Sequence, residues 1–105
     1  MTIKEFKKLL EDTFEKSRKT YNHKMNEYAT DIDVFQSFRK GVGFSFQSTP
    51  EGVAWEYACK HFESIKNIIS KCPEQVPTDE LLDEKIGDAI NYLIIIKALV
   101  KERGD

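Results

Sequence analysis

The residues with the clearest chemical potential lie in the segment 83–92, near the end of the chain. Glu84, Asp88 and Asn91 are spaced i, i+4 and i+7, so on a helix their side chains stack along one face. Two carboxylates one turn apart repel each other, and burying one of them without a partner is costly. The pattern therefore predicts either Mg²⁺ held by Glu84 and Asp88 or an ion-pair network with basic side chains. The candidate basic side chains are Lys24, Arg39 and Lys60.

Lys60 and His61 form a second candidate group, within a segment whose periodicity predicts a helix. His61 falls on an apolar stripe of that helix, where it would act as a general base or contact a phosphate. Lys60 would supply a point charge for the same phosphate. The alternative is that His61 is a packed, hydrogen-bonded core residue with no ligand.

Lys24, Glu27 and Tyr28 form a third candidate group, at the end of the first predicted helix. Lys24 and Glu27 share one helical face, and Tyr28 follows Lys24 by one turn. Taken alone, the group is typical of a solvated last turn. Beside the other two groups it predicts one local pocket, in which basic side chains face the two carboxylates.

An aromatic segment over residues 34–46 carries four phenylalanines, of which Phe35 and Phe38 are spaced as on a short helix. So much apolar surface is unfavourable in a solvated loop. We therefore expect the segment to pack onto the helices or onto a partner. Arg39, next to Phe38, is a candidate phosphate contact.

The elements that must position these groups are helices. Thr2 and Glu5 predict a capping box, Thr49 followed by Pro50 predicts a helix start, and Thr78 or Asp79 predicts another. Apolar residues between these signals recur with a period of 3.6. The expected helices cover residues 2–28, 34–40 (with Asp33 as its cap), 49–71 and about 79–102. We expect one all-α domain over residues 1–105, a four-helix bundle with an irregular aromatic segment before the third helix.

The last predicted helix is apolar on nearly all sides after Asp88. Such a helix lies in the middle of a bundle or in an interface between chains. A chain of 105 residues cannot easily cover every face of it. The pattern therefore predicts a homo-oligomer, a dimer or higher.

Composition narrows the class of protein further. The chain has 16 basic and 18 acidic residues, a net charge of −2, which argues against generic binding of duplex nucleic acid. The uncharged run Ala89–Ile96 has eight residues, far fewer than the roughly 20 that cross a bilayer, so we expect no membrane span. Cys59 and Cys72 are thirteen residues apart, too far for a disulfide on one helix. We expect a cytoplasmic protein with reduced thiols, Cys59 in the core.

The candidate groups, in their order along the chain, resemble a known family. The segments are Lys24-x-x-Glu27-Tyr28, Phe35-x-x-Phe38, Lys60-His61-x-x-Ser64-Ile65 and Asp83-Glu84-Lys85-Ile86-Gly87-Asp88-Ala89-Ile90-Asn91-Tyr92-Leu93. Over roughly residues 20–100 the chain resembles small phage and prophage proteins akin to the nucleotide modification associated domain group, with its MazG-like helices. The resemblance implies a MazG-like bundle, and a host-cell cytoplasmic location if the chain is phage-encoded.

MazG-type enzymes are all-α, oligomeric nucleoside triphosphate pyrophosphohydrolases that hold Mg²⁺ with acidic motifs on two helices. The resemblance implies that Glu84 and Asp88 belong to the second motif. The chain departs from that motif at Lys85, three residues before Asp88, where the family has an acid. The first motif of the family is Glu-Glu-x-x-Glu. It is missing here, because Glu56 and Glu63 of the third predicted helix are seven residues apart. These departures favour nucleotide binding without hydrolysis, or an entirely different use of the same scaffold.

Three functions follow, in order of preference. The first is a phage-type accessory protein that binds a nucleotide or another phosphorylated ligand without hydrolysing it. The second is a non-catalytic phage protein that inhibits a host defence system through residues 34–46. The third is a Mg²⁺-dependent pyrophosphohydrolase of MazG type. The predicted ligand-binding residues are Lys24, Glu27, Tyr28, Phe35, Phe38, Arg39, Lys60, His61 and Asn91, with Glu84 and Asp88 at the metal.

Overall fold

The computed structural model describes the backbone of residues 1–28 and 35–105 and the side chains of residues 1–21 and 35–105. Over these ranges all regular structure is helical. The helices are α1 (Ile3–Tyr28), α2 (Gln36–Gly41), α3 (Pro50–Lys71) and α4 (Asp79–Gly104). Each begins and ends within two residues of its prediction, so the all-α class is confirmed. The predicted cap Asp33 lies outside the described residues, and Phe35 occupies the N-cap position of α2.

The helix starts form as the capping residues predict. Thr2 and Glu5 exchange hydrogen bonds: the Thr2 amide donates to Glu5 Oε2 (3.2 Å) and the Glu5 amide donates to Thr2 Oγ1 (3.1 Å). The Oγ1 of Thr49 accepts from the amide three residues later, and Pro50 is the first residue of α3. Thr78, rather than Asp79, caps α4 in the same way. In α1, α3 and α4, local side chains therefore satisfy amides that the start of the helix leaves unpaired.

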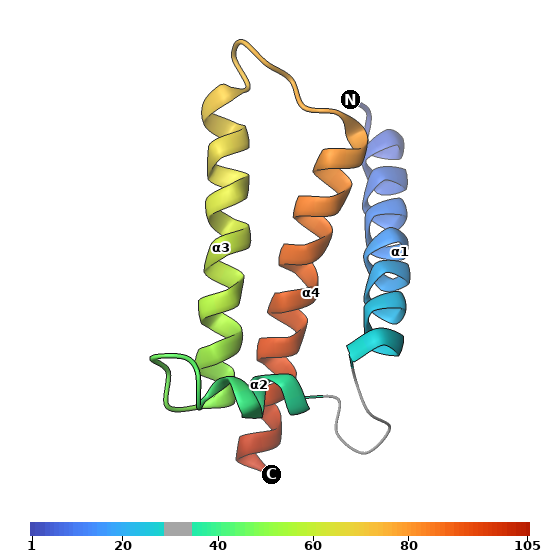
Figure 1. The fold of residues 1–105 in the computed structure, drawn as a ribbon. Coiled ribbons are helices and arrows are strands. Elements are labelled where there is room, and N and C mark those ends of the chain that lie inside the picture. The colour runs from blue at the N-terminus through green and yellow to red at the C-terminus, as the bar shows by residue number, and fades with distance from the viewer. Residues whose placement is uncertain (29–34) are drawn as a thin grey trace.

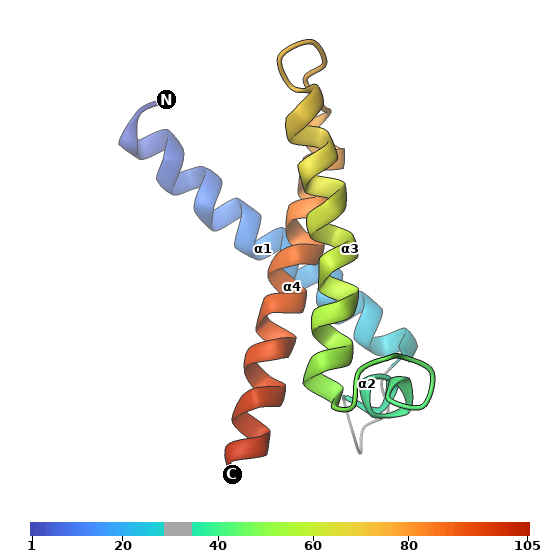
Figure 2. The ribbon, with the colours of Figure 1, turned by 90° about the vertical axis from the view of Figure 1, so that its left-hand side faces the viewer.

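Helix α4 lies in the middle of the molecule (Figure 1). Helix α3 runs antiparallel along one side of it, and α1 crosses its other side obliquely (Figure 2). The short α2 packs against the beginning of α3, near the C-terminal end of α4 (Figure 1). This central place accounts for part of the apolar surface of α4, while Leu93, Ile94 and Val100 of the same helix are exposed.

The core is small and lies where α2, α3 and α4 meet. It is built around Val53 and Ala54 of α3, with Phe38 of α2 and Leu99 of α4. Gly41 ends α2 directly over Val53: a Cβ at that position would lie 2.7 Å from Val53 Cγ1. The absence of a side chain at Gly41 therefore lets α2 approach α3 closely.

Polar contacts fix the crossing of α1 and α4. The amide nitrogen Nδ2 of Asn91 donates to the backbone oxygen of Ser17 (3.1 Å), and both residues are buried. Gly87 faces Ser17, and a Cβ there would lie 3.3 Å from Ser17 Oγ. At the surface Lys16 Nζ is 2.8 Å from Asp83 Oδ2, and this hydrogen bond raises the pKa of Lys16. The crossing thus depends on small and polar side chains.

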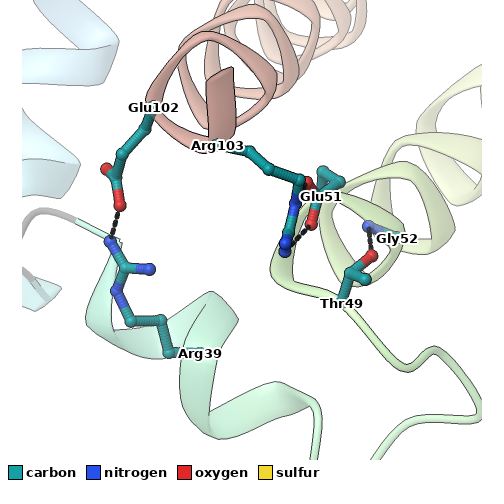
Figure 3. A network of polar contacts seen from close by, with 6 residues as sticks. All are labelled: Arg39, Thr49, Glu51, Gly52, Glu102 and Arg103. Atoms are coloured by element: carbon teal, nitrogen blue, oxygen red, sulfur yellow. Dashed lines mark hydrogen bonds and ion pairs between the residues drawn. The ribbon is translucent and has the colours of Figure 1, made fainter. Parts of the chain in front are cut away.

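The C-terminal end of α4 is tied to α2 and α3 by two arginine–glutamate pairs (Figure 3). Arg39 of α2 pairs with Glu102, and Arg103 pairs with Glu51 in the first turn of α3. The Arg103 guanidinium donates to both carboxylate oxygens of Glu51. This pairing, with hydrogen bonds from the Glu51 amide and Thr49, lowers the pKa of Glu51 to about 2.

We expect the Glu51→Gln variant to lose stability at neutral pH but not in acid. Because folding lowers the pKa of Glu51, its contribution is present above pH 4.5 and is lost as the pH falls towards 2. Arg103 is exposed, so the loss near pH 7 should be only about 1 kcal/mol. Urea unfolding between pH 2 and pH 7 measures it, with the exposed Glu63→Gln as the matched control in the same helix. A stability difference that does not change with pH would contradict the conclusion that pairing with Arg103 lowers the pKa of Glu51.

Three expectations about burial need correction. Cys59 is exposed rather than in the core, although both cysteines are free, as predicted. Phe38 is buried as expected, but Phe44 and Phe46 are fully exposed, so only part of the aromatic segment packs onto the helices. Trp55 is also exposed, although the apolar period of the predicted helix 49–71 is typical of a buried face. No described helix is long and apolar enough to cross a membrane.

Candidate functional site

The chemically distinctive part of the structure lies between α3 and α4, around His61. The Nδ1 atom of His61 is 3.8 Å from Oδ2 of Asp88, so the two form an ion pair when the imidazole is protonated. Only 9% of the Asp88 side chain is exposed, against 25% of the His61 side chain. Tyr92 stacks on the imidazole, with ring centroids 4.8 Å apart and planes inclined by 30°. A carboxylate and an aromatic ring thus fix the orientation of His61.

Helical spacing explains how these groups meet. Asp88 and Tyr92 are one turn apart on α4 and so share a face, and His61 of α3 contacts both. Tyr57 precedes His61 by one turn, and the Lys60 ammonium lies 5.6 Å from the centre of the Tyr57 ring. We call these residues, Tyr57, Lys60, His61, Asp88 and Tyr92, the His61 cluster. It joins an ammonium, an imidazole, a carboxylate and two phenol rings.

The arrangement suits the binding of an anion. A carboxylate beside one ring nitrogen orients an imidazole, while the other nitrogen stays available to a ligand. In the His61 cluster, Asp88 takes the Nδ1 side, so Nε2 is the atom that a ligand would use. Lys60 is exposed and makes no contact with a carboxylate among the described residues. An ammonium and an imidazole therefore lie on consecutive residues of α3.

Glu84 and Asp88, the predicted metal ligands, differ in their exposure and in their neighbours. Asp88 is nearly buried beside His61, but 63% of the Glu84 side chain is exposed, and Glu84 lies 3.8 Å from Lys85. Within residues 1–21 and 35–105, no group of three histidine, cysteine or acidic side chains is placed to hold a metal ion. Asn91, the third residue of the predicted stripe, donates to Ser17 and thereby holds α1. The described donor set does not fit the multi-carboxylate Mg²⁺ site of MazG-type enzymes.

Arg39 lies away from the His61 cluster. It pairs with Glu102, which is fourteen residues, or roughly 21 Å along the helix, from Asp88. Phe38 is a buried core residue with ring contacts to Tyr57 and Tyr92, so it packs against these two rings of the cluster from the core. The sequence predicts that Phe38 contacts the ligand, but the buried ring is not open to stack on a base. Phe35 is half-buried against the same core.

The side chains of Lys24, Glu27 and Tyr28 lie outside the described residues, so their predicted place in the pocket stays a prediction. Two residues of the His61 cluster were not among the predicted site residues. Tyr92 carries a detectable signal, because it follows Asp88 by one turn in the most specific segment of the sequence. Tyr57 precedes His61 by one turn on the same stripe, and a search for aromatics at that spacing would have found it.

Comparison with known proteins returned no match: no family model, no curated protein and no solved structure is similar to this chain.

Proposed function

We propose that this protein binds a phosphorylated small molecule at the His61 cluster, with a nucleotide as the favoured class. The observation that carries the proposal is the nearly buried Asp88 carboxylate facing Nδ1 of His61. Burying a carboxylate is costly unless it is paired with a cation and hydrogen-bonded. An imidazole held in this way directs its second nitrogen towards a ligand, and that nitrogen donates a hydrogen bond when the ring is protonated.

The residues around this pair match the parts of a nucleotide. Lys60 supplies a strongly hydrated point charge of the kind that contacts phosphates. The half-buried rings of Tyr57 and Tyr92 line the cluster with aromatic surface, against which the apolar part of a nucleotide would pack. The sequence resemblance to nucleotide-associated phage proteins, on Lys60, His61 and the segment 83–92, points to the same class. The proposed function is binding without hydrolysis, and pyrophosphohydrolysis of MazG type is the alternative within this site.

A thermal-shift screen tests the proposal. We expect at least one nucleoside mono-, di- or triphosphate to raise the melting temperature, because a ligand that binds only the native state stabilises it. At a ligand concentration 100 times the dissociation constant, the gain is about 2.7 kcal/mol. Parallel screens with and without Mg²⁺ show whether Glu84 and Asp88 recruit a cation to the complex. Assay of pyrophosphate release with the stabilising triphosphate separates binding from hydrolysis.

A second candidate function is favoured by the loop between α2 and α3. Phe44 and Phe46 are fully exposed there, two residues apart, and neither contributes to the protein's own core. Exposed aromatic side chains of this kind are typical of anchors in protein interfaces. We propose partner binding through this loop as the role if no nucleotide changes the melting temperature in the screen. A phage protein that inhibits a host defence factor would belong to this class.

A further inference from the structure

The chain exposes much more surface than a compact protein of its mass. Its accessible surface is 8143 Å², whereas a compact monomer of 12.2 kDa exposes roughly 6,100 Å². Its radius of gyration is 15.8 Å, against about 13 Å for a compact domain of 105 residues. The excess, about 2,000 Å², lies within the area that each partner buries in a large obligate homodimer.

Much of the open apolar surface lies on one face of α1. Ile3, Phe6, Leu10 and Phe14 follow one another at helical spacing, and we call them the α1 stripe. Their side chains are 78%, 56%, 45% and 54% exposed. Figure 2 shows why: the N-terminal half of α1 diverges from α4 beyond the crossing at Ser17. Four large apolar residues in a row on an open helix are unusual for a monomer.

The opening between α1 and α4 continues this surface. A groove of about 350 Å³ lies there, and its apolar lining comes from Leu9 of α1 and from Leu82 and Ile86 of α4. Leu9 and Leu82 are both exposed. The α1 stripe and the groove together give two neighbouring apolar surfaces at the same end of the molecule.

We propose that the α1 stripe is the interface of a homodimer, in which a second copy of this chain packs its own α1 stripe antiparallel to the first. The proposal goes beyond the proposed function and does not depend on a ligand. A twofold arrangement matches each surface with itself, so it covers the α1 stripes of both chains at once. It also closes, and so leaves no stripe exposed for further addition.

The charges beside the α1 stripe favour this partner. Lys7 and Glu11 are one turn apart along one border of the stripe. In an antiparallel pair centred at Leu9, Lys7 of one copy lies beside Glu11 of the other, and the reverse pair forms by symmetry. The border is therefore complementary to itself, which would not be needed for an unrelated apolar partner.

Sedimentation equilibrium tests the dimer on the full chain. We expect a mass twice 12.2 kDa for the wild type. Phe6→Glu places a charge in the interface and should weaken the dimer at least about 100-fold without lowering helicity, because Phe6 is not part of the chain's own core. Phe46→Glu, the same change at an exposed site on the loop after α2, should leave the dimer intact.

A charge exchange tests the arrangement within the dimer. Lys7→Glu should weaken association, because it places two glutamates side by side, and the double variant Lys7→Glu with Glu11→Lys should restore it. Rescue requires that the two positions meet across the twofold axis. A wild type that stays at 12.2 kDa at all concentrations, or a dimer that survives Phe6→Glu, would overturn the proposal. Failure of the double variant to rescue would overturn the antiparallel arrangement.

Discussion

Val53→Asp is expected to abolish the folded state at 25 °C. Val53 is the largest side chain with no exposed surface, and it contacts Phe38, Ala54 and Leu99 at the junction of α2, α3 and α4. A carboxylate at this position has no cation within the core, and burying it unpaired costs several kcal/mol. The total stability of a small domain is about 5–15 kcal/mol, and this core is small, so one such substitution removes most of it.

Circular dichroism during heating measures this effect, with all proteins at one concentration because self-association shifts the melting temperature. Val76→Asp is the matched control, since Val76 lies in the exposed loop before α4 and makes no core contact. We expect that control to change the free energy of unfolding by less than about 0.5 kcal/mol. A cooperative transition of Val53→Asp close to that of the wild type would show that the core does not lie at this junction.

Much of the fold could be predicted from the sequence because its signals are local. Thr2, Thr49 and Thr78 each start a helix through a hydrogen bond to an amide three residues later, which the residue types alone reveal. The apolar pattern of α4 left two positions open, the middle of a bundle or an interface between chains, and the structure places the helix between α1 and α3.

The packing of the helices could not be predicted in this way. Arg39 pairs with Glu102 because α2 lies beside the C-terminal end of α4, and that docking depends on Gly41 opposite Val53. No spacing in the sequence connects residues 63 positions apart. The exposure of the α1 stripe has the same origin: its period predicts a buried face, but only the crossing angle decides how much of it α4 covers.

The candidate site was predicted in part. His61 and Asp88 were both candidates, each on its own helix, and the structure brings them together. Their pairing depends on the relative position of α3 and α4, which the sequence does not specify. Asn91 was assigned to the ligand because it stacks with Asp88, yet its side chain donates to Ser17 on α1. Helical spacing predicts which residues share a face, but not which neighbour that face meets.

Lys60→Glu is expected to weaken binding of the phosphorylated ligand at least 100-fold. The change replaces an attractive charge by a repulsive one beside the phosphates, and a hydrogen bond to a charged group alone contributes about 1.5–3 kcal/mol. Stability should change little, because Lys60 is exposed and its ammonium contacts only the Tyr57 ring among the described groups. Lys66→Glu, the same change at an exposed position of α3, is the matched control.

Isothermal titration calorimetry on the wild type and these two variants tests the central claim, that the His61 cluster binds a phosphorylated ligand. The titrant is the nucleotide that gives the largest thermal shift, used under the same salt and Mg²⁺ conditions. We expect one binding site per chain in the wild type, an unchanged dissociation constant in Lys66→Glu and one at least 100-fold higher in Lys60→Glu. Binding of equal strength in all three proteins, or no binding by the wild type, would contradict the claim.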